Sequence, residues 1–226
     1  MKKIFQTALA LAATLACSAA FAGGGTITFD SVLPNILTNG DVTTEGNAVI
    51  TTVGQGGFDG SISDQSSCFL AICPSGNATQ FYAALNDGGL NIKLFDGGLN
   101  LTGLDFGFVL PLSAALDFSV GQLLVTGIDA LGGSTTIQRD FDLQDANGNY
   151  NFSHWDFDTG FASSWFQSVT ISSCLYDGNG GCVNPAENQA QFAVDNIGYL
   201  PEPGSVALVG VSLAGLLAAK RRRRSV

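Results

Sequence analysis

The chain has 226 residues, of which 46% are hydrophobic, and its formal net charge at pH 7 is −10. Residues 23–200 are more acidic than that value suggests: 18 acidic residues against Lys93 and Arg139 leave a charge of −16. A segment with this charge repels nucleic acids and anionic lipids, so we exclude both as its partners. Its length suits a single domain with a sizeable core.

The first 22 residues have the order of a secretory signal peptide. Lys2 and Lys3 precede an apolar run that ends in Ala20-Phe21-Ala22, with small residues where signal peptidase requires them. We therefore expect residues 1–22 to direct export through the Sec machinery and to be removed by signal peptidase. A lipoprotein acylated at Cys17 is the alternative, although Thr14 stands where such sites usually have leucine.

Residues 23–200 carry the pattern of β structure. Short segments alternate apolar and polar residues or form brief apolar runs, and Gly, Asn and Asp separate them. No helical period persists between them, which predicts an all-β fold with a single β-sandwich. The first and last segments are expected to be neighbouring strands. The predicted segments are 26–32, 48–53, 91–95, 101–110, 115–120, 122–128, 134–143, 150–157, 168–172 and 191–200.

Four cysteines remain once Cys17 leaves with the signal peptide, and an even number in an exported domain indicates disulfides. Of the three connectivities we favour the two local pairs, Cys68–Cys73 and Cys174–Cys182. Turn-forming residues follow the first pair directly and lie within the second, so each pair would fix a loop rather than the whole fold. Both spacings are poor for a zinc site, which is the competing interpretation.

His154 is the only histidine, and it follows Ser153 directly. Adjacent positions on a strand point to opposite faces, and the chain contains no Gly-x-Ser-x-Gly motif, so we interpret His154 as a structural or surface residue. Asp156 and Asp158 are two residues apart and would share a face, with Cα atoms about 7 Å apart. This pair keeps open the alternative of a glycan-active enzyme.

One segment resembles the start of a calcium-binding loop. Asp145, Asn147 and Asn149 have the Asp-x-Asn-x-Asn spacing, and Asp156 falls at the twelfth position, but the sixth position is tyrosine instead of glycine. Asn147-Gly148 is also a strong signal for a type I′ hairpin turn. We therefore predict no cofactor and no metal, with Ca²⁺ as the alternative.

The two tryptophans, Trp155 and Trp165, are the candidate glycan contacts. An exposed indole offers a flat apolar surface to a sugar ring, and neighbouring Asp and Asn side chains can bond the sugar hydroxyls. The competing interpretation places both tryptophans in the core. Phe106 and Phe108 share one face by their spacing and are predicted core residues.

The C-terminal 26 residues combine three features in order. Pro201-Glu202-Pro203 is extended and resists helix formation. Residues 204–219 are apolar or small and predict a transmembrane helix about 24 Å long, slightly short of a bilayer core of about 30 Å. The basic residues 220–224 would remain in the cytoplasm. Together they predict a membrane-anchored tail with an accessible processing site.

This tail resembles the PEP-CTERM sorting domain, and Gln191, Phe192 and Asp195 resemble the QFxxD subgroup of the proteins that carry it. The resemblance implies a Gram-negative bacterium that makes exopolysaccharide. It also implies that an exosortase in the inner membrane processes the tail, residues 201–226, at or near Pro201-Glu202-Pro203. Bodies of such proteins are often jelly-roll or lectin-like, which is the expectation for residues 23–200. Gln191, Phe192 and Asp195 are expected to act structurally in the last strand.

From these features we predict an exported protein of the cell surface or extracellular matrix, anchored in the inner membrane before processing. Its role would be structural or adhesive in exopolysaccharide or biofilm, and it would not be an enzyme. A carbohydrate-binding module is the first alternative, and a secreted glycan-active enzyme is the second.

Overall fold

Alternation of side chains along each strand separates a core face from a solvent face. In β4 (Ala48–Val53), Ala48, Ile50 and Thr52 are buried, while Val49, Thr51 and Val53 are partly exposed. The computed structural model describes residues 24–68, 71–111, 119–176, 182–183 and 190–202. Gly24–Leu200 forms one compact unit.

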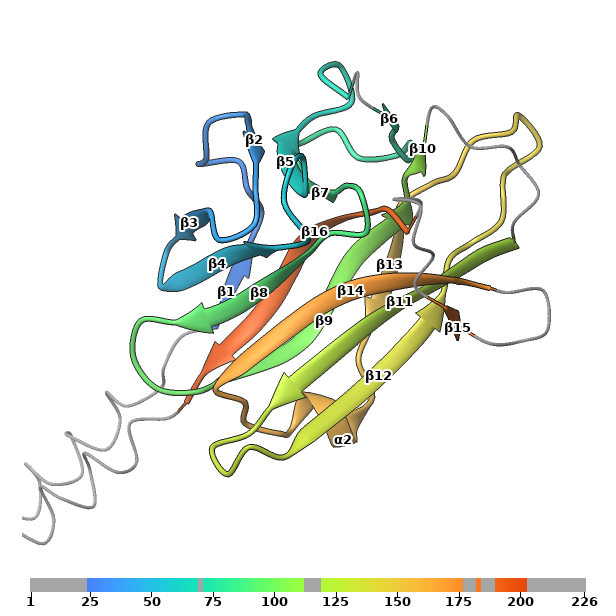
Figure 1. The fold of residues 1–226 in the computed structure, drawn as a ribbon. Coiled ribbons are helices and arrows are strands. Elements are labelled where there is room, and N and C mark those ends of the chain that lie inside the picture. The colour runs from blue at the N-terminus through green and yellow to red at the C-terminus, as the bar shows by residue number, and fades with distance from the viewer. Residues whose placement is uncertain (1–23, 69–70, 112–118, 177–181, 184–189, 203–226) are drawn as a thin grey trace, which may run out of the picture. The chain divides into compact units, whose positions relative to one another are not determined.

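Two antiparallel sheets form a sandwich-like arrangement (Figure 1). Sheet A contains, in spatial order, β13 (Ser153–Asp156), β9 (Leu99–Phe108), β16 (Phe192–Pro201), β7 (Phe81–Ala84), β5 (Gly60–Ser63) and β2 (Asn35–Leu37), with β1 (Gly25–Ile27) also beside β16. Sheet B contains β12 (Ser134–Asp140), β11 (Ser119–Ile128), β14 (Ser168–Tyr176), β8 (Gly89–Leu94), β4 and β3 (Val42–Glu45), with β15 (Cys182–Val183) beside β14. The predicted all-β sandwich is confirmed, whereas the jelly-roll or lectin-like type stays a prediction.

The main core lies between the two sheets. Leu104, Phe106 and Phe108 of sheet A and Val125 and Ile171 of sheet B are all buried in it. Ring contacts connect the aromatic members: the centroids of Phe106 and Phe141 are 5.7 Å apart, and those of Phe108 and Phe141 are 5.5 Å apart. The prediction that Phe106 and Phe108 are core residues is confirmed.

The first and last strands of the body are neighbours, as predicted. β1 pairs antiparallel with β16, and Gly25 lies opposite Tyr199. A Cβ at Gly25 would come within 2.6 Å of the Tyr199 ring, so a larger residue there would displace the ring. The two ends of the body are therefore joined through backbone hydrogen bonds in sheet A.

A second, smaller core lies on the outer face of sheet A. Phe81 and Ala83 of β7 and Ala193 of β16 are buried there beneath Ala71 and Cys73. The covering segment forms a two-stranded sheet of β6 (Ala71–Ile72) and β10 (Leu110–Pro111). All residues of β7 and β5 are buried: β7 is apolar on both faces and does not alternate, and β5 has only four residues, too few for a clear period. For this reason the sequence pattern missed both strands.

The described residues contain a single short helix, α2 (Thr159–Ala162), which Asp158 caps by accepting a hydrogen bond from the Phe161 N–H. No helix in the described ranges is long and apolar enough to cross a membrane. The predicted signal peptide 1–22, transmembrane helix 204–219 and basic residues 220–224 lie outside the described residues.

Candidate functional site

A pocket of about 290 Å³ opens on the outer face of sheet A, over β2, β5 and β7. Its base is formed by Ser61, Ser63 and Ala83, and Asn35 and Ile36 of the edge strand β2 line its exposed side. The remaining lining residues are Pro34, Ile62, Ser67, Cys68, Ala71 and Leu85. The lining is thus mainly apolar with a few hydroxyl and amide groups, which is the usual composition of a small-molecule pocket.

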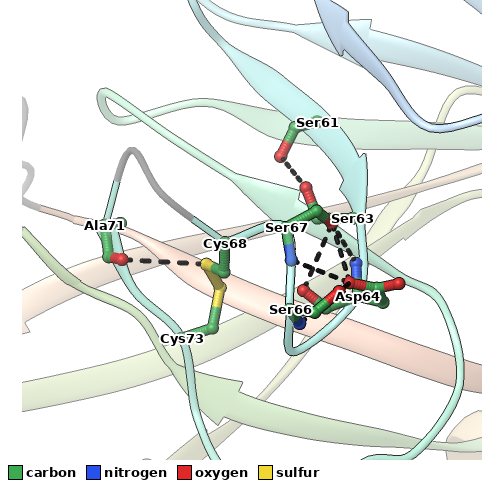
Figure 2. Close-up of a disulfide and its surroundings, with 8 residues drawn as sticks. All are labelled: Ser61, Ser63, Asp64, Ser66, Ser67, Cys68, Ala71 and Cys73. Carbon is green, nitrogen blue, oxygen red and sulfur yellow. Dashed lines mark hydrogen bonds between the residues drawn. A yellow bond between two sulfur atoms is a disulfide. The ribbon is translucent and has the colours of Figure 1, made fainter.

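Two hydroxyl groups supply the polar part of the pocket base. The Oγ atoms of Ser61 and Ser63 lie 3.0 Å apart, and both residues are more than nine-tenths buried. Figure 2 shows this pair beside the turn that leads into the disulfide. Each hydroxyl can donate one hydrogen bond and accept two, so the pair has capacity left for a ligand.

The segment over the pocket is held in place by a turn and a disulfide. Asp64 accepts hydrogen bonds from the backbone N–H groups of Ser66 and Ser67, at 2.9 and 2.8 Å, and from both their hydroxyls. These bonds lower the pKa of Asp64 to about 2, and the bond from the Ser66 hydroxyl contributes most. Immediately after this turn, Cys68 and Cys73 form the predicted disulfide (Figure 2). The pocket is therefore formed before any ligand binds.

The second predicted disulfide is only partly described. Cys174 in β14 is disulfide-bonded. The backbone of Cys182 in β15 pairs with Tyr176, two residues beyond Cys174. The side chain of Cys182 lies outside the described residues, so the pairing Cys174–Cys182 stays a prediction.

His154 lies in a polar cluster on another part of the outer face of sheet A. Its Nδ1 is 2.6 Å from Asp105 Oδ1, and its Nε2 is 3.1 Å from Asp156 Oδ1. A carboxylate only accepts hydrogen bonds, so both contacts are satisfied together when the imidazole carries two protons. The hydrogen bond with Asp105 is the main cause of the raised pKa of His154.

The same cluster connects the edge strand β13 with both sheets. Asn196 of β16 donates to Asp105 Oδ2 at 2.7 Å, and Arg139 of β12 donates to the backbone carbonyl of His154 at 3.1 Å. The Arg139 guanidinium also lies 5.6 Å from the centroid of the Phe106 ring. This geometry gives His154 a role in holding β13.

We expect His154 to make stability depend on pH near neutrality. Its raised folded pKa means that its contribution is complete below the unfolded value of 6.5 and is lost as the pH rises through the folded pKa. The contribution should stay below about 1 kcal/mol, since the side chain is 58% exposed. Urea unfolding of the wild type and His154→Gln should differ more at about pH 6 than at about pH 8.5. An equal difference at both values would contradict this assignment.

The two tryptophans have different environments. Trp155 is only 8% exposed and its ring centroid lies 4.9 Å from that of Phe157, so it belongs to the core and offers no sugar platform. Its neighbour on the solvent face of β13 is His154, as strand alternation requires. Trp165 is 37% exposed and stays a candidate glycan contact, but it does not line the pocket.

The acidic candidates are used within the fold. Asp156 contacts His154, whereas Asp158 caps α2, so the two carboxyl groups have separate structural partners. Asp145 accepts hydrogen bonds from the N–H groups of Asn147 and Asn149, at 2.8 and 2.9 Å. These bonds lower the pKa of Asp145.

The predicted type I′ turn at Asn147-Gly148 is wrong. Gly148 has φ +82°, but Asn147 is not among the residues with positive φ, and type I′ requires positive φ at both. The segment between β12 and β13 is a loop closed by a tight turn, in which the Gly148 N–H donates to the Asp145 carbonyl. The described residues contain no group of three His, Cys, Asp or Glu side chains arranged to hold a metal. The calcium alternative, Asp145, Asn147, Asn149 and Asp156, includes two asparagines and stays a prediction.

The residues of the QFxxD resemblance lie at the start of the last strand. Gln191, Phe192 and Asp195 are buried. Asp195 accepts a hydrogen bond from Asn77 Nδ2 at 2.7 Å, and the Thr79 hydroxyl lies 3.1 Å from the same oxygen. The carboxylate thereby fastens the 77–79 segment to β16. This geometry agrees with the structural role expected for Asp195.

The pocket residues themselves were missed by the sequence reasoning. Ser61 and Ser63 alternate with Gly60 and Ile62 in a short segment that carries no recognisable motif. The only usable signal was the nearby cysteine pair, which indicated a loop fixed by a disulfide. Neither cysteine nor composition indicates which strands lie beneath that loop.

No family model and no curated protein matches the chain. Among solved structures, it is similar to a CBM32 module of a family 31 glycoside hydrolase from Clostridium perfringens, with 14% identity over 58% of this chain and 88% of that one, at a TM-score of 0.28. It is also similar to the C-terminal family 22 carbohydrate-binding module of Clostridium thermocellum Xyn10B, with 9% identity over 81% and 98%, at 0.33. A third is the CBM28 module described as specific for non-crystalline cellulose, with 11% identity over 56% and 78%, at 0.30. Likeness at these TM-scores decides neither ligand nor site.

Proposed function

We propose that this chain is an exported protein of the Gram-negative cell surface or extracellular matrix whose body binds a neutral glycan in the pocket of sheet A. The observation that carries the glycan part is the preformed pocket, with its buried Ser61–Ser63 hydroxyl pair under the Cys68–Cys73 segment. Its role would be structural or adhesive within exopolysaccharide or biofilm.

The chemistry of the pocket suits a sugar unit. A sugar ring has apolar C–H faces and a rim of hydroxyls, which match the apolar lining and the serine pair respectively. Ile36 lies opposite Ser61 on the edge strand β2, where its exposed side chain can contact an apolar face of the ring. The charge of −16 on residues 23–200 disfavours an anionic ligand, and the pocket lining has no carboxylate to bind a cationic one, which favours a neutral ligand.

Replacing Ser61 by leucine is expected to abolish binding in the pocket, because the side chain would fill the cavity and remove one hydroxyl. The measurement is calorimetric titration of the full chain with a panel of neutral oligosaccharides. Ser163→Leu, at an exposed position after α2, is the matched control and should bind as the wild type does. Undiminished binding by folded Ser61→Leu would place the glycan elsewhere.

The sorting part of the proposal rests on the order of features in the tail: Pro201-Glu202-Pro203, an apolar segment and a basic cluster. β16 ends at Pro201, and Glu202 is exposed. Processing by an exosortase at or after this motif would thus leave every strand of the body intact. Cleavage before Tyr199 would remove a residue that pairs with Gly25 of β1.

The intact mass of the protein recovered from its own cells tests this sorting. We expect the segment after Pro201-Glu202-Pro203 to be missing when the exosortase is present and to be retained when its gene is deleted. The C-terminal peptide identifies the processed bond. An intact RRRRSV end in both strains would make the tail a plain membrane anchor and would refute exosortase processing.

A further inference from the structure

The outer face of sheet B is almost free of charge, in contrast to the rest of the body. Its side chains alternate with core residues such as Leu123, Val125 and Ile171. Among the described outward-facing side chains of β4, β8, β11, β12 and β14, only Asp140 and Lys93 are charged. Residues 23–200 contain 18 acidic residues, and only Asp140 belongs to this set of outward-facing side chains.

A row of hydroxyl and amide groups crosses this face. Strand register aligns Thr136 with Thr126, Thr126 with Thr170, Thr170 with Asn91, and Asn91 with Thr51. Neighbouring strands are ~4.8 Å apart, so the five side chains span ~19 Å perpendicular to the strands. We call this set the hydroxyl row.

Hydrogen bonds orient four of the five side chains in the row. The Oγ1 atoms of Thr126 and Thr136 are 2.9 Å apart, and Asn91 Nδ2 donates to Thr170 Oγ1 at 2.8 Å. Each threonine hydroxyl still has free acceptor capacity, and the Asn91 amide has a carbonyl oxygen. The row therefore presents ordered polar groups that lose little side-chain freedom when a ligand binds.

Partly exposed aliphatic side chains flank the row. Leu124 and Ile128 lie two residues on either side of Thr126 along β11, and Val49 and Val53 flank Thr51 along β4. The face thus combines ordered hydroxyls with apolar strips. Figure 1 shows β8, β14, β11 and β12 side by side, with no described segment crossing over them.

We propose that this face binds an extended neutral polysaccharide chain, lying along the hydroxyl row across the strands. Successive sugar hydroxyls would bond to the threonines and Asn91, and C–H faces would contact the flanking aliphatic side chains. The inference goes beyond the pocket, because the two sites lie on opposite sheets of one sandwich. One molecule could then bridge two glycan chains, and bridging gives avidity that neither site has alone.

A second copy of this chain is the competing occupant of the face. Pairing two bodies of −16 each brings like charges together, which opposes association at low ionic strength. The face offers only Lys93 as a positive group to offset this repulsion. A neutral polymer meets no such penalty, so the charge distribution favours the polysaccharide.

The test is affinity electrophoresis of the full chain in detergent through gels containing hydroxyethylcellulose, dextran or galactomannan, with alginate as the anionic comparison. Thr126→Val/Thr170→Val removes two hydroxyls and keeps the β-branched shape. We expect retardation by at least one neutral polymer in the wild type, and affinity about tenfold lower in the double variant, as loss of two hydrogen bonds predicts.

Thr135→Val is the matched control, since Thr135 is on β12 but points away from the face that carries Thr136. It should be retarded as the wild type is. If the double variant unfolds, Thr136→Asp at the exposed end of the row provides a second test and should also weaken retardation. Equal retardation of wild type and folded row variants would overturn the proposal. So would retardation by no neutral polymer, or a dimer in sedimentation that the row variants abolish.

Failure of this proposal is distinguishable from failure of the pocket. Ser61→Leu should keep the retardation by long polymers but lose oligosaccharide binding in calorimetry. The row variants should show the opposite pattern. Loss of both activities in Ser61→Leu would assign all glycan binding to sheet A and refute the hydroxyl row.

Discussion

Replacing Trp155 by alanine is expected to lower the free energy of unfolding by about 3–5 kcal/mol. The side chain is 8% exposed, and its ring centroid lies 5.9 Å from that of Phe106 and 4.9 Å from that of Phe157. Truncation removes this apolar area from the core and leaves a cavity between the rings of Phe106 and Phe157. Urea unfolding followed by far-UV circular dichroism measures the loss.

Trp165→Ala is the matched control, because the same truncation at a 37% exposed side chain leaves no enclosed cavity and should cost about 1 kcal/mol or less. The two variants also separate stability from binding. Oligosaccharide affinity in the pocket should be retained by folded Trp155→Ala. Equal destabilisation by the two substitutions would contradict the different burial of the two tryptophans.

Strand alternation predicted several of the strands of which one face meets solvent, although it missed the short edge strands β2 and β3. β4, β11 and β12 were predicted within a few residues, because their outward positions are polar or partly exposed. β7 has the sequence Phe-Tyr-Ala-Ala with all four residues buried, since the disulfide segment covers its outer side. A two-residue period cannot arise on a strand that is apolar on both faces.

The candidate site was less predictable than the fold, because it depends on register between distant segments. The pocket requires β2, β5 and β7 to lie side by side, and the hydroxyl row requires five strands to be aligned. Neither alignment is visible in a single segment. Local pairing of Cys68 with Cys73 was predictable, since the two cysteines are close in sequence and turn-forming residues follow Cys73.

Most of the functional carboxylates that sequence motifs suggested have structural roles in the local fold. Asp145 orders its own turn, Asp158 caps α2, and Asp156 contacts His154. Asp and Asn are frequent in turns and caps because their short side chains bond the nearby backbone. In a body with 18 acidic residues, spacing alone therefore does not distinguish a functional carboxylate from a turn or cap.

Replacing Asp195 by alanine is expected to cost about 2–3 kcal/mol of unfolding free energy, because it removes a buried carboxylate that accepts several hydrogen bonds. Asp195 is 0% exposed and accepts hydrogen bonds from Asn77 Nδ2 and the Asn196 N–H, each at 2.7 Å. Without it the 77–79 segment loses its attachment to β16. Asp142→Ala, at an exposed carboxylate, is the control and should change stability by less than about 0.5 kcal/mol.

The cost of Asp195→Ala should also depend on pH in a defined direction. Burial raises the pKa of Asp195 above 3.8, although hydrogen bonds from Asn77, Asn196 and Thr79 oppose this shift. A raised folded pKa means that the carboxyl favours folding most below 3.8, and that this contribution is lost as the pH rises through the folded value. The stability difference between wild type and variant should therefore widen as the pH falls from about 7 toward 4. A difference that narrows over this range would mean that the hydrogen bonds outweigh burial, and that Asp195 is a stabilised carboxylate instead of a strained one.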